Sequence, residues 1–295
     1  MHIPDAMLQG TVCPVTAAVA ALGLSATAYA AWKTAKKPSA LSFAAVSALI
    51  FAAQMLNFPV HFGTSGHVLG AALAVALLGT PFGILSMSLA VLMQCLVFAD
   101  GGVSVLGANL LNMAIIAALP AVIVRKFILK ENTAAAAKAT MYGVAALVSV
   151  LLASTACSVE LAAAGVVPLG KVLPSMLFIH LLIGLCEGAL TAALYPVFAG
   201  QIQTADNKRS WLVPFGAAIL AAFVLSPFAC QSPDGLEYVA GMLGFGHLSS
   251  AFFAAPFADY SVPLLSAGMF STAAAGLIGV ALMFASGYGL RRLFR

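Results

Sequence analysis

Long apolar segments follow one another along almost the whole chain, and this pattern constrains the fold more than any other feature of the sequence. Of the 295 residues, 62% are hydrophobic and only 7% are charged. A soluble domain carries about 25% charged residues. The charged side chains are too few to cover the surface of a soluble protein of this size. Lipid must therefore surround most of the chain. The same composition excludes a disordered chain, a nucleic-acid-binding protein and a secreted disulfide scaffold.

The apolar segments have the lengths of membrane-spanning helices, which need about 20 mostly apolar residues. All must be helical, because an open strand edge in lipid leaves backbone groups without hydrogen-bond partners. The sequence therefore predicts an all-α, polytopic membrane helix bundle of about nine transmembrane segments. One of them, 66–79, is shorter than the others. The predicted segments are 11–32, 39–57, 66–79, 81–98, 105–124, 139–164, 173–199, 212–230 and 263–288.

The basic residues indicate the orientation of these segments. If the N-terminus lies outside and the segments alternate, twelve of the 13 Lys and Arg residues are cytoplasmic, and only Lys171 is not. The positive-inside rule then supports 66–79 as a true crossing, an external N-terminus and a cytoplasmic C-terminus. The cytoplasmic basic residues are Lys33, Lys36, Lys37, Arg125, Lys126, Lys130, Lys138, Lys208, Arg209, Arg291, Arg292 and Arg295.

The predicted external side is acidic and would attract cations. No basic region precedes the first apolar segment, so we do not expect a secretory signal peptide. The external acidic residues are Asp5, Asp100, Glu160, Asp234, Glu237 and Asp259.

A polar stretch, 200–211, divides the chain into two units. The N-terminal unit, 1–204, has about seven segments, and the C-terminal unit, 205–295, has two. An external loop of about thirty residues, 231–262, joins these two segments and is long enough to contact another part of the protein or a partner.

Motifs for ATP use and for hydrolytic enzymes are absent from the sequence. It contains no P-loop, no HExxH and no GxSxG motif, so we expect no enzyme activity, and any ATP-driven motor must be another subunit. The five cysteines are scattered without a CxxC pair, and we interpret them as apolar filler in helices.

The first two residues form a potential metal chelator. Met1 precedes the bulky His2, which normally leaves the initiator methionine in place with a free amine. The Met1 amine, the His2 backbone nitrogen and the His2 imidazole Nδ1 can bind one ion through a five- and a six-membered ring. A deprotonated amide nitrogen favours planar binding of Ni(II), Cu(II) or cobalt. The alternative is a frayed terminus with an incidental histidine.

His67 is the candidate for a fourth nitrogen ligand. It follows Gly63-Thr64-Ser65-Gly66 at the outer start of the short segment, where Thr64 and Ser65 are predicted to cap the helix. A helix that ends inside the membrane often contributes to an ion site. The alternative for His67 is a purely structural cap. His61 lies in the preceding external loop, either as an ion-access ligand or as a solvated side chain.

Two further polar groups lie within predicted membrane segments. His180 and Glu187 are seven residues apart, on one helix face, and either form a proton or metal relay or fix helix packing or a subunit contact. Asn109 and Asn112 share another face and would support a ligand shell.

Several separated motifs, in order, resemble the substrate-specific membrane component of cobalt and nickel energy-coupling factor importers. The C-terminal unit resembles the small companion subunit of these importers, fused to the first. The motifs of the first unit are Met1-His2-Ile3-Pro4-Asp5, Gly63-Thr64-Ser65-Gly66-His67, Phe98-Ala99-Asp100-Gly101-Gly102, Leu106-Gly107-Ala108-Asn109, Asn112-Met113, and His180 to Gly188; those of the second are Ser232-Pro233-Asp234-Gly235-Leu236-Glu237 and Ala258-Asp259-Tyr260.

The resemblance implies that the Met1 amine, the His2 amide and imidazole, and His67 bind the ion. It also implies a coupling transmembrane subunit and an ATPase pair made as separate chains, in a bacterial or archaeal cell (inner) membrane. Nickel or cobalt would be the transported substrate, with no cofactor and no nucleic-acid partner. We expect supporting roles for Asp5, His61, Thr64, Ser65 and Asn109.

Ala6 departs from the family pattern, which has glycine after the aspartate, and this loosens the expected turn.

Two other functions remain open: a membrane enzyme with His180 and Glu187 as an acid–base pair, and a scaffold that binds no ion. Substitution of His2 separates them from the importer subunit, because only the importer subunit would lose ion binding. We expect the C-terminal unit to help the ion load without forming the ion site.

Overall fold

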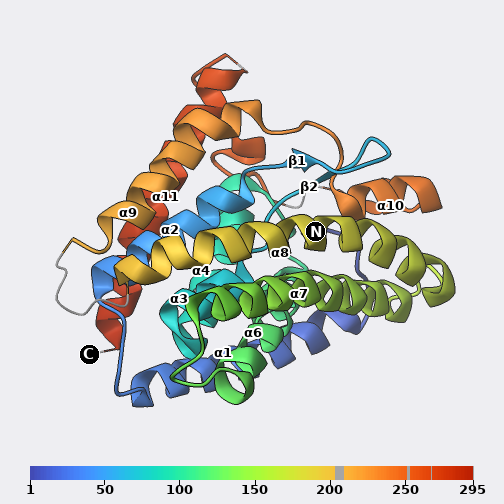
Figure 1. Cartoon of the computed structure of the whole chain (residues 1–295). Coiled ribbons are helices and arrows are strands. Elements are labelled where there is room, and N and C mark those ends of the chain that lie inside the picture. Colours follow the sequence, from blue (N-terminus) through green and yellow to red (C-terminus); the bar gives the residue numbers. More distant parts are fainter. Residues whose placement is uncertain (203–208, 251–252, 267, 295) are drawn as a thin grey trace.

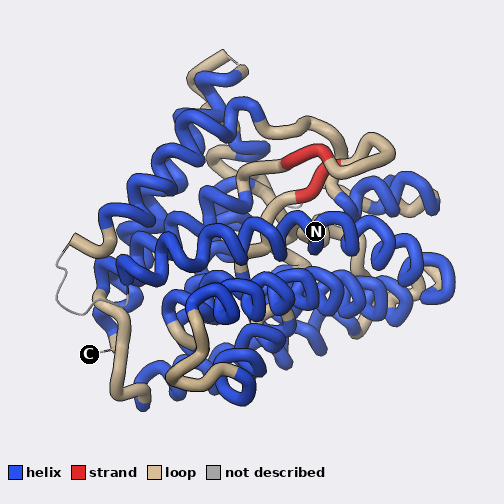
Figure 2. Tube along the Cα trace, viewed as in Figure 1, coloured by secondary structure: helices blue, strands red, loops and turns tan. Residues whose placement is uncertain are grey.

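The structure is a computed structural model that describes residues 1–202, 209–250, 253–266 and 268–294. The predicted boundary between residues 204 and 205, together with Lys208 and Arg295, lies outside the described residues. Helices dominate the described ranges, where the only strands are β1 (Phe58–Pro59) and β2 (Ser65–Gly66), paired antiparallel (Figure 2). The predicted all-α class is confirmed.

The helices form a bundle in which segments far apart in sequence lie side by side (Figure 1). Two longer segments, Leu106–Ile128 and Leu212–Phe228, contain short π or 3-10 stretches. The helices are α1 (Val12–Lys33), α2 (Ala40–Gln54), α3 (Ala71–Leu78), α4 (Thr80–Phe98), α5 (Leu106–Leu110), η1 (Leu111–Ile116), α6 (Leu119–Ile123), η2 (Val124–Ile128), α7 (Ala135–Ala163), α8 (Leu169–Ile202), α9 (Leu212–Leu220), η3 (Ala221–Leu225), η4 (Ser226–Phe228), α10 (Gly235–Leu243), η5 (Gly246–Leu248), η6 (Ala258–Tyr260) and α11 (Met269–Leu293).

Helical structure is present at each of the nine predicted ranges, and in the described part six helices are long and apolar enough to cross a membrane. The short segment differs most from its prediction. Its helix, α3, begins at Ala71 after Gly70, so Thr64 and Ser65 do not cap it. At eight residues α3 is about 12 Å long. All eight are buried, which allows irregular backbone to precede it inside the protein.

The helices α7 and α8 lie side by side along much of their length (Figure 1). A Cβ atom on Gly143 would lie 2.7 Å from the Gly188 carbonyl oxygen, so these backbones approach closely only because both residues are glycine. Small residues commonly permit such contacts between membrane helices. This packing turns His180 and Glu187 of α8 into the protein interior, where both are buried.

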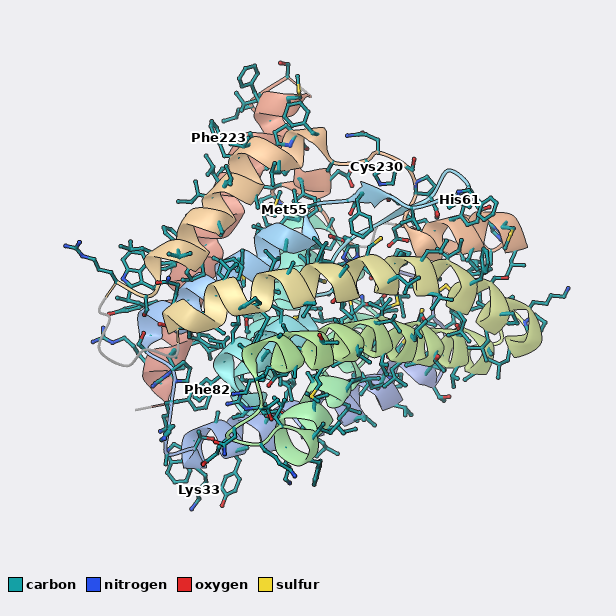
Figure 3. All side chains as sticks on the ribbon, viewed as in Figure 1. Lys33, Met55, His61, Phe82, Phe223 and Cys230 are labelled. Carbon is teal, nitrogen blue, oxygen red and sulfur yellow. The ribbon has the colours of Figure 1, made fainter. Side chains whose placement is uncertain are left out.

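Large apolar side chains cover the outside of several long helices. On α1, Val15, Val19 and Leu22 are exposed, and Phe223 projects outward from the C-terminal unit (Figure 3). Exposed apolar surface of this extent is what lipid contact requires. The chain is therefore a multi-pass membrane protein.

The C-terminal unit packs against α2 through α9 and α11. Gly287 allows the close approach, because a Cβ there would lie 3.1 Å from Cα of Ala44. The predicted external loop contains an additional helix, α10, which packs on α8. Asp234 caps α10 by accepting from the Glu237 backbone N–H, and Glu237 accepts in return from the Asp234 N–H. The loop thereby reaches across to the N-terminal unit.

Candidate metal site

The N-terminal segment is folded into the protein and is not frayed. Ile3 is fully buried, and its backbone N–H donates to Asn109 Oδ1 at 2.8 Å. The Ile3 carbonyl accepts from Asn109 Nδ2 at 3.0 Å and from the Gly102 N–H at 2.9 Å. Asn109 therefore holds the backbone of the residue that follows the potential chelate.

The turn after this residue is fixed by Asp5. Its Oδ1 accepts from the Ser104 N–H at 2.8 Å and from the Ser104 hydroxyl at 2.6 Å. A Cβ on Gly102 would lie 2.3 Å from the Asp5 nitrogen, so a side chain has no room there. Ala6 adopts φ 64°, a left-handed conformation that favours glycine. The turn predicted to be loosened by alanine is formed, with alanine in an unfavourable conformation.

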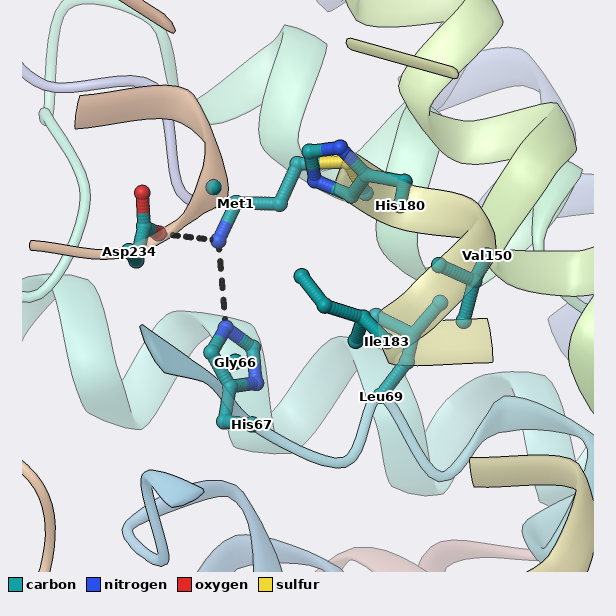
Figure 4. Close-up of a pocket in the computed structure, with 9 residues that line it drawn as sticks. Met1, Gly66, His67, Leu69, Val150, His180, Ile183 and Asp234 are labelled. Carbon is teal, nitrogen blue, oxygen red and sulfur yellow. Dashed lines mark hydrogen bonds and ion pairs between the residues drawn. The ribbon is translucent and has the colours of Figure 1, made fainter. Parts of the chain in front are cut away.

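His67 lies between β2 and α3, directly beside the chain terminus (Figure 4). Its Nδ1 lies 3.1 Å from the Val68 carbonyl, which can only accept, so Nδ1 carries the proton. Its Nε2 lies 3.1 Å from the Met1 amino nitrogen. The rings of His2 and His67 stack with their centroids 5.5 Å apart. The structure thus brings together Met1, His2 and His67, the three residues predicted to bind the ion.

Asp234 of the C-terminal unit forms an ion pair with the Met1 amino group (Figure 4). Burial lowers the pKa of this amine, but the charge and hydrogen bond of Asp234 outweigh burial and raise it above 8.0. Burial raises the pKa of Asp234, yet the ammonium holds that pKa well below its usual range. His67 Nε2 faces this ammonium while Nδ1 donates to the Val68 carbonyl, so the ring is neutral. A charged pair therefore lies beside a neutral imidazole.

His2 contacts two residues of the α4–α5 region. Its Nε2 lies 3.1 Å from Gln94 Oε1, and its Nδ1 lies 2.9 Å from Asp100 Oδ1. The other Asp100 oxygen accepts from the Tyr260 hydroxyl at 2.7 Å. Tyr260 and Asp234 thus both reach the site from the C-terminal unit, and neither contact is predicted from the sequence. The one feature of the sequence that could have pointed to these contacts is that both residues belong to motifs of the external loop.

A cavity of about 360 Å³ separates the two units next to His2 and His67. Its walls carry four carboxylates, two of which, Asp100 and Asp234, also contact predicted ligands. Negative charge at the mouth of a cleft concentrates cations. The carboxylates that line the cavity are Asp100, Asp234, Glu237 and Asp259.

Side chains alone do not form a metal site in the described ranges, where no three His, Cys, Asp or Glu residues are spaced to hold an ion. An ion site here depends on backbone nitrogen atoms. The Met1 amine and the His2 amide would have to supply the nitrogen donors that side chains do not.

The remaining predicted residues support the surroundings of this region. His61 is exposed in the loop between β1 and β2 (Figure 3). Its ring contacts the ring of Phe62 at a tilted angle, with the centroids 3.9 Å apart. The Thr64 hydroxyl donates to the His61 carbonyl at 3.1 Å. The Ser65 hydroxyl donates to the Ser232 carbonyl at 2.7 Å, which ties the hairpin to the C-terminal unit.

His180 and Glu187 have separate partners and do not form a pair with each other in the described contacts. Glu187 accepts from the backbone N–H groups of Leu69 at 2.7 Å and Gly70 at 2.9 Å. It therefore fixes the irregular segment between His67 and α3. His180 Nδ1 donates to the Met176 carbonyl at 2.8 Å. In the described contacts, His180 and Glu187 therefore do not form the acid–base pair that the alternative function, a membrane enzyme, would need.

The fold and the converging nitrogen groups are those of a metal-transport membrane protein. The model of the cobalt uptake substrate-specific transmembrane region matches residues 2–205, and the PDGLE domain model matches residues 208–295. The chain belongs to the cobalt uptake substrate-specific transmembrane family, with a PDGLE domain following, and the resemblance seen in the sequence is confirmed.

Individual proteins agree with this membership. The chain is 34% identical to a putative fused nickel transport protein, NikMN, of Archaeoglobus fulgidus, over 100% of this chain and 99% of that protein. It is 28% identical to a probable fused nickel transport protein, LarMN, of Lactiplantibacillus plantarum, over 89% of each. A crystal structure of a transition metal transporter is similar with a TM-score of 0.59 and 29% identity, covering 72% of this chain and 99% of that chain.

Proposed function

We propose that this chain is the metal-capture subunit of an energy-coupling factor importer, driven by ATP, for nickel or cobalt ions. The ion is the transported substrate and not a cofactor. A coupling transmembrane subunit and a pair of ATPase subunits are separate chains. Membership of the cobalt uptake family and similarity to proteins named as fused nickel transport proteins support this proposal.

The observation that carries the proposal is the convergence of the buried residues Met1 and His2 with the half-buried His67 at one place. We infer that the ion is held by the Met1 amine, the His2 amide nitrogen, the His2 imidazole and His67 Nε2. The 3.1 Å separation of the amine and His67 Nε2 supports this set, since one ion can bind both. Four nitrogen donors with one deprotonated amide favour planar nickel, copper or cobalt.

Binding through His2 Nδ1 requires this atom to leave Asp100, and binding through the amine requires it to leave Asp234. Both carboxylates then remain next to the ion and offset its charge. His67 needs no such change, because its lone pair already faces the amine.

We propose nine membrane crossings with the N-terminus outside and the C-terminus in the cytoplasm. Arg125 of the predicted cytoplasmic loop donates to the Ala76 carbonyl near the end of α3 at 3.3 Å. This contact supports 66–79 as a crossing, because the end of α3 then lies on the side of the basic loops.

We further propose that residues 1–204 form the metal-binding unit and residues 205–295 a unit that promotes ion loading. The contacts of Asp234 with the Met1 amine and of Tyr260 with Asp100 support this division of roles. The acidic cavity between the units offers the ion a route to His2 and His67 from the external side.

Metal analysis and nickel titration of the purified full chain test the proposal. We expect one ion per chain, with loss of binding in His2→Ala and His67→Ala and normal binding in His247→Ala, which changes an exposed histidine. Unchanged binding in His2→Ala would leave a scaffold or an enzyme as the function.

A further inference from the structure

A mostly apolar groove lies on the outside of the bundle. Its volume of about 370 Å³ is within the range of pockets that bind small molecules. Three separate elements form its walls: the loop between β1 and β2, the first turns of α8, and α10 (Figure 1). None of the described residues that line it is charged. They include Phe62, Ser175, Phe178, Ile179, Tyr238 and Met242.

The groove leaves large apolar side chains uncovered. Phe62 is 55% exposed, Phe178 is 54% exposed and Met242 is 55% exposed, one from each wall. The ring centroids of Phe62 and Phe178 lie 6.0 Å apart, so the hairpin loop and α8 form one continuous apolar surface. Because exposed apolar surface of this kind marks a site of contact with a membrane or a partner, the groove needs an apolar occupant.

One face of α8 carries a basic side chain at one end of this groove and apolar side chains beyond its other end. Lys171, Phe178 and Leu185 follow one another at seven-residue spacing, so they share one helix face with a rise of about 10 Å between successive members. All three are exposed. An acyl chain leaving the groove past Phe178 would therefore stay on apolar surface, while a headgroup at the start of α8 would meet Lys171.

The charge of Lys171 is available to an anion. No carboxylate pairs with its ammonium group among the described residues. It is also the one basic residue that the proposed orientation places on the external side. Tyr238 of α10, which lines the groove, adds a phenol, and tyrosine is enriched at membrane interfaces. An ammonium group and a phenol beside an apolar groove match a phosphate joined to an acyl chain.

The walls of the groove belong to elements that also border the candidate metal site. The hairpin loop continues into β2 and then His67, and α10 begins directly after Asp234, which pairs with the Met1 amine. A molecule in the groove would bridge the hairpin loop, α8 and α10. Since a ligand stabilises the arrangement that binds it, an occupied groove would favour the position of α10 in which Asp234 reaches Met1.

We propose that this groove binds an anionic phospholipid of the outer leaflet. One acyl chain lies between Phe62, Phe178 and Met242, and the phosphate lies at Lys171. The bound lipid joins the hairpin loop to α10 and thereby steadies the contact of the C-terminal unit with Met1. This inference goes beyond the proposed function, because it concerns neither the ion nor its ligands. Only the choice of leaflet depends on the proposed orientation.

Native mass spectrometry of the purified full chain tests this, with phosphatidylglycerol and phosphatidylcholine of identical acyl chains as the probes. We expect one phosphatidylglycerol to be retained per chain in preference to phosphatidylcholine. Lys171→Ala should weaken phosphatidylglycerol binding about fivefold and remove the preference. Ser175→Trp, which fills the groove, should abolish retention of both lipids. Lys36→Ala changes an exposed lysine elsewhere and is the matched control, with binding as in the natural sequence.

Hydrogen exchange gives a second readout. Added phosphatidylglycerol should slow exchange of the α10 backbone amides in the natural sequence but not in Lys171→Ala. The inference is overturned if the natural sequence retains both lipids equally, or if phosphatidylglycerol leaves α10 exchange unchanged, and neither measurement depends on how a variant folds. A crosslink from Phe178→Cys to the coupling subunit of the assembled importer would also overturn it, because a protein would then cover the groove. Nickel titration of the same samples tests the proposed function separately.

Discussion

The amino group of Met1 is ion-paired with Asp234, a residue 233 positions further along the chain. One candidate ligand of the N-terminal unit is thus held by a carboxylate of the C-terminal unit. The same turn also binds Ser65 through the Ser232 and Pro233 carbonyls. The two units are therefore connected at the place where the ion is proposed to bind, and this relationship leads to the first prediction.

Asp234→Asn should reduce metal uptake by cells severalfold while the purified protein still binds one nickel ion at about pH 8. The amide keeps the shape of the turn but removes the charge that holds the Met1 ammonium. Glu131→Gln, which removes an exposed charge elsewhere, is the control for uptake. Full uptake by Asp234→Asn would show that the C-terminal unit does not act through this contact.

The pH dependence of nickel affinity should follow the Met1 amine and not His67. A nitrogen ligand binds only when unprotonated, so each protonated ligand steepens the rise of affinity with pH until the pH passes its pKa. The His2 amide releases its proton at every pH, so above the amine pKa the rise becomes less steep but continues. The His67 ring is already neutral, because only its Nδ1 donates and its Nε2 faces the Met1 amine. The pKa of the amine is raised above 8.0. Affinity measured by titration should rise about tenfold or more per pH unit from about pH 6 to 8.

In Asp234→Asn the same curve should become less steep at lower pH, because the main interaction that raises the amine pKa is lost. A flat profile in the natural sequence would argue for oxygen ligands and against the amine.

An extension before Met1 should abolish nickel binding. It converts the amine into an amide and adds bulk where Met1 is 7% exposed and in contact with His67 and Asp234. A tag after the C-terminus is the matched control, with expected normal binding. The measurement is nickel content of purified protein before and after proteolytic release of the extension. Tight binding by the extended, uncleaved chain would disprove the chelate.

Glu187→Ala should weaken nickel binding without removing a proposed ligand. It leaves the buried N–H groups of Leu69 and Gly70 without their acceptor, at a cost of about 1–3 kcal/mol for each unsatisfied group. The segment that carries His67 would then lose its fixed position. Glu187→Gln keeps an acceptor oxygen and should show a smaller loss in the same titration. Equal, normal affinities in both variants would contradict this positioning role.

Ala6→Gly should stabilise the protein by about 1 kcal/mol, because φ 64° costs an L-residue about that much relative to glycine. Thermal unfolding in detergent measures the shift, and Ala6→Val should lower the midpoint. If glycine destabilises the chain, the left-handed conformation at this turn is wrong.

Local features of the sequence are enough to predict the class of protein, the helical segments and the three candidate ligands. Apolar runs and basic loops depend on local composition, which bilayer thickness and the positive-inside rule convert directly into segments. His2 was found because its chelate with Met1 involves adjacent residues. Ala6 was marked by its departure from glycine, and the backbone conformation there gives the reason.

Contacts between groups far apart in the sequence depend on the folded bundle. Periodicity placed His180 and Glu187 on one face of α8, but their different partners, Met176 and the Leu69–Gly70 backbone, come from how each turn of the helix packs. The start of α3 at Ala71 and the contact of Asp234 with Met1 likewise depend on chain segments far apart in sequence. Such contacts leave no local pattern, because they are fixed by packing of the whole bundle and by the need to pair buried charges.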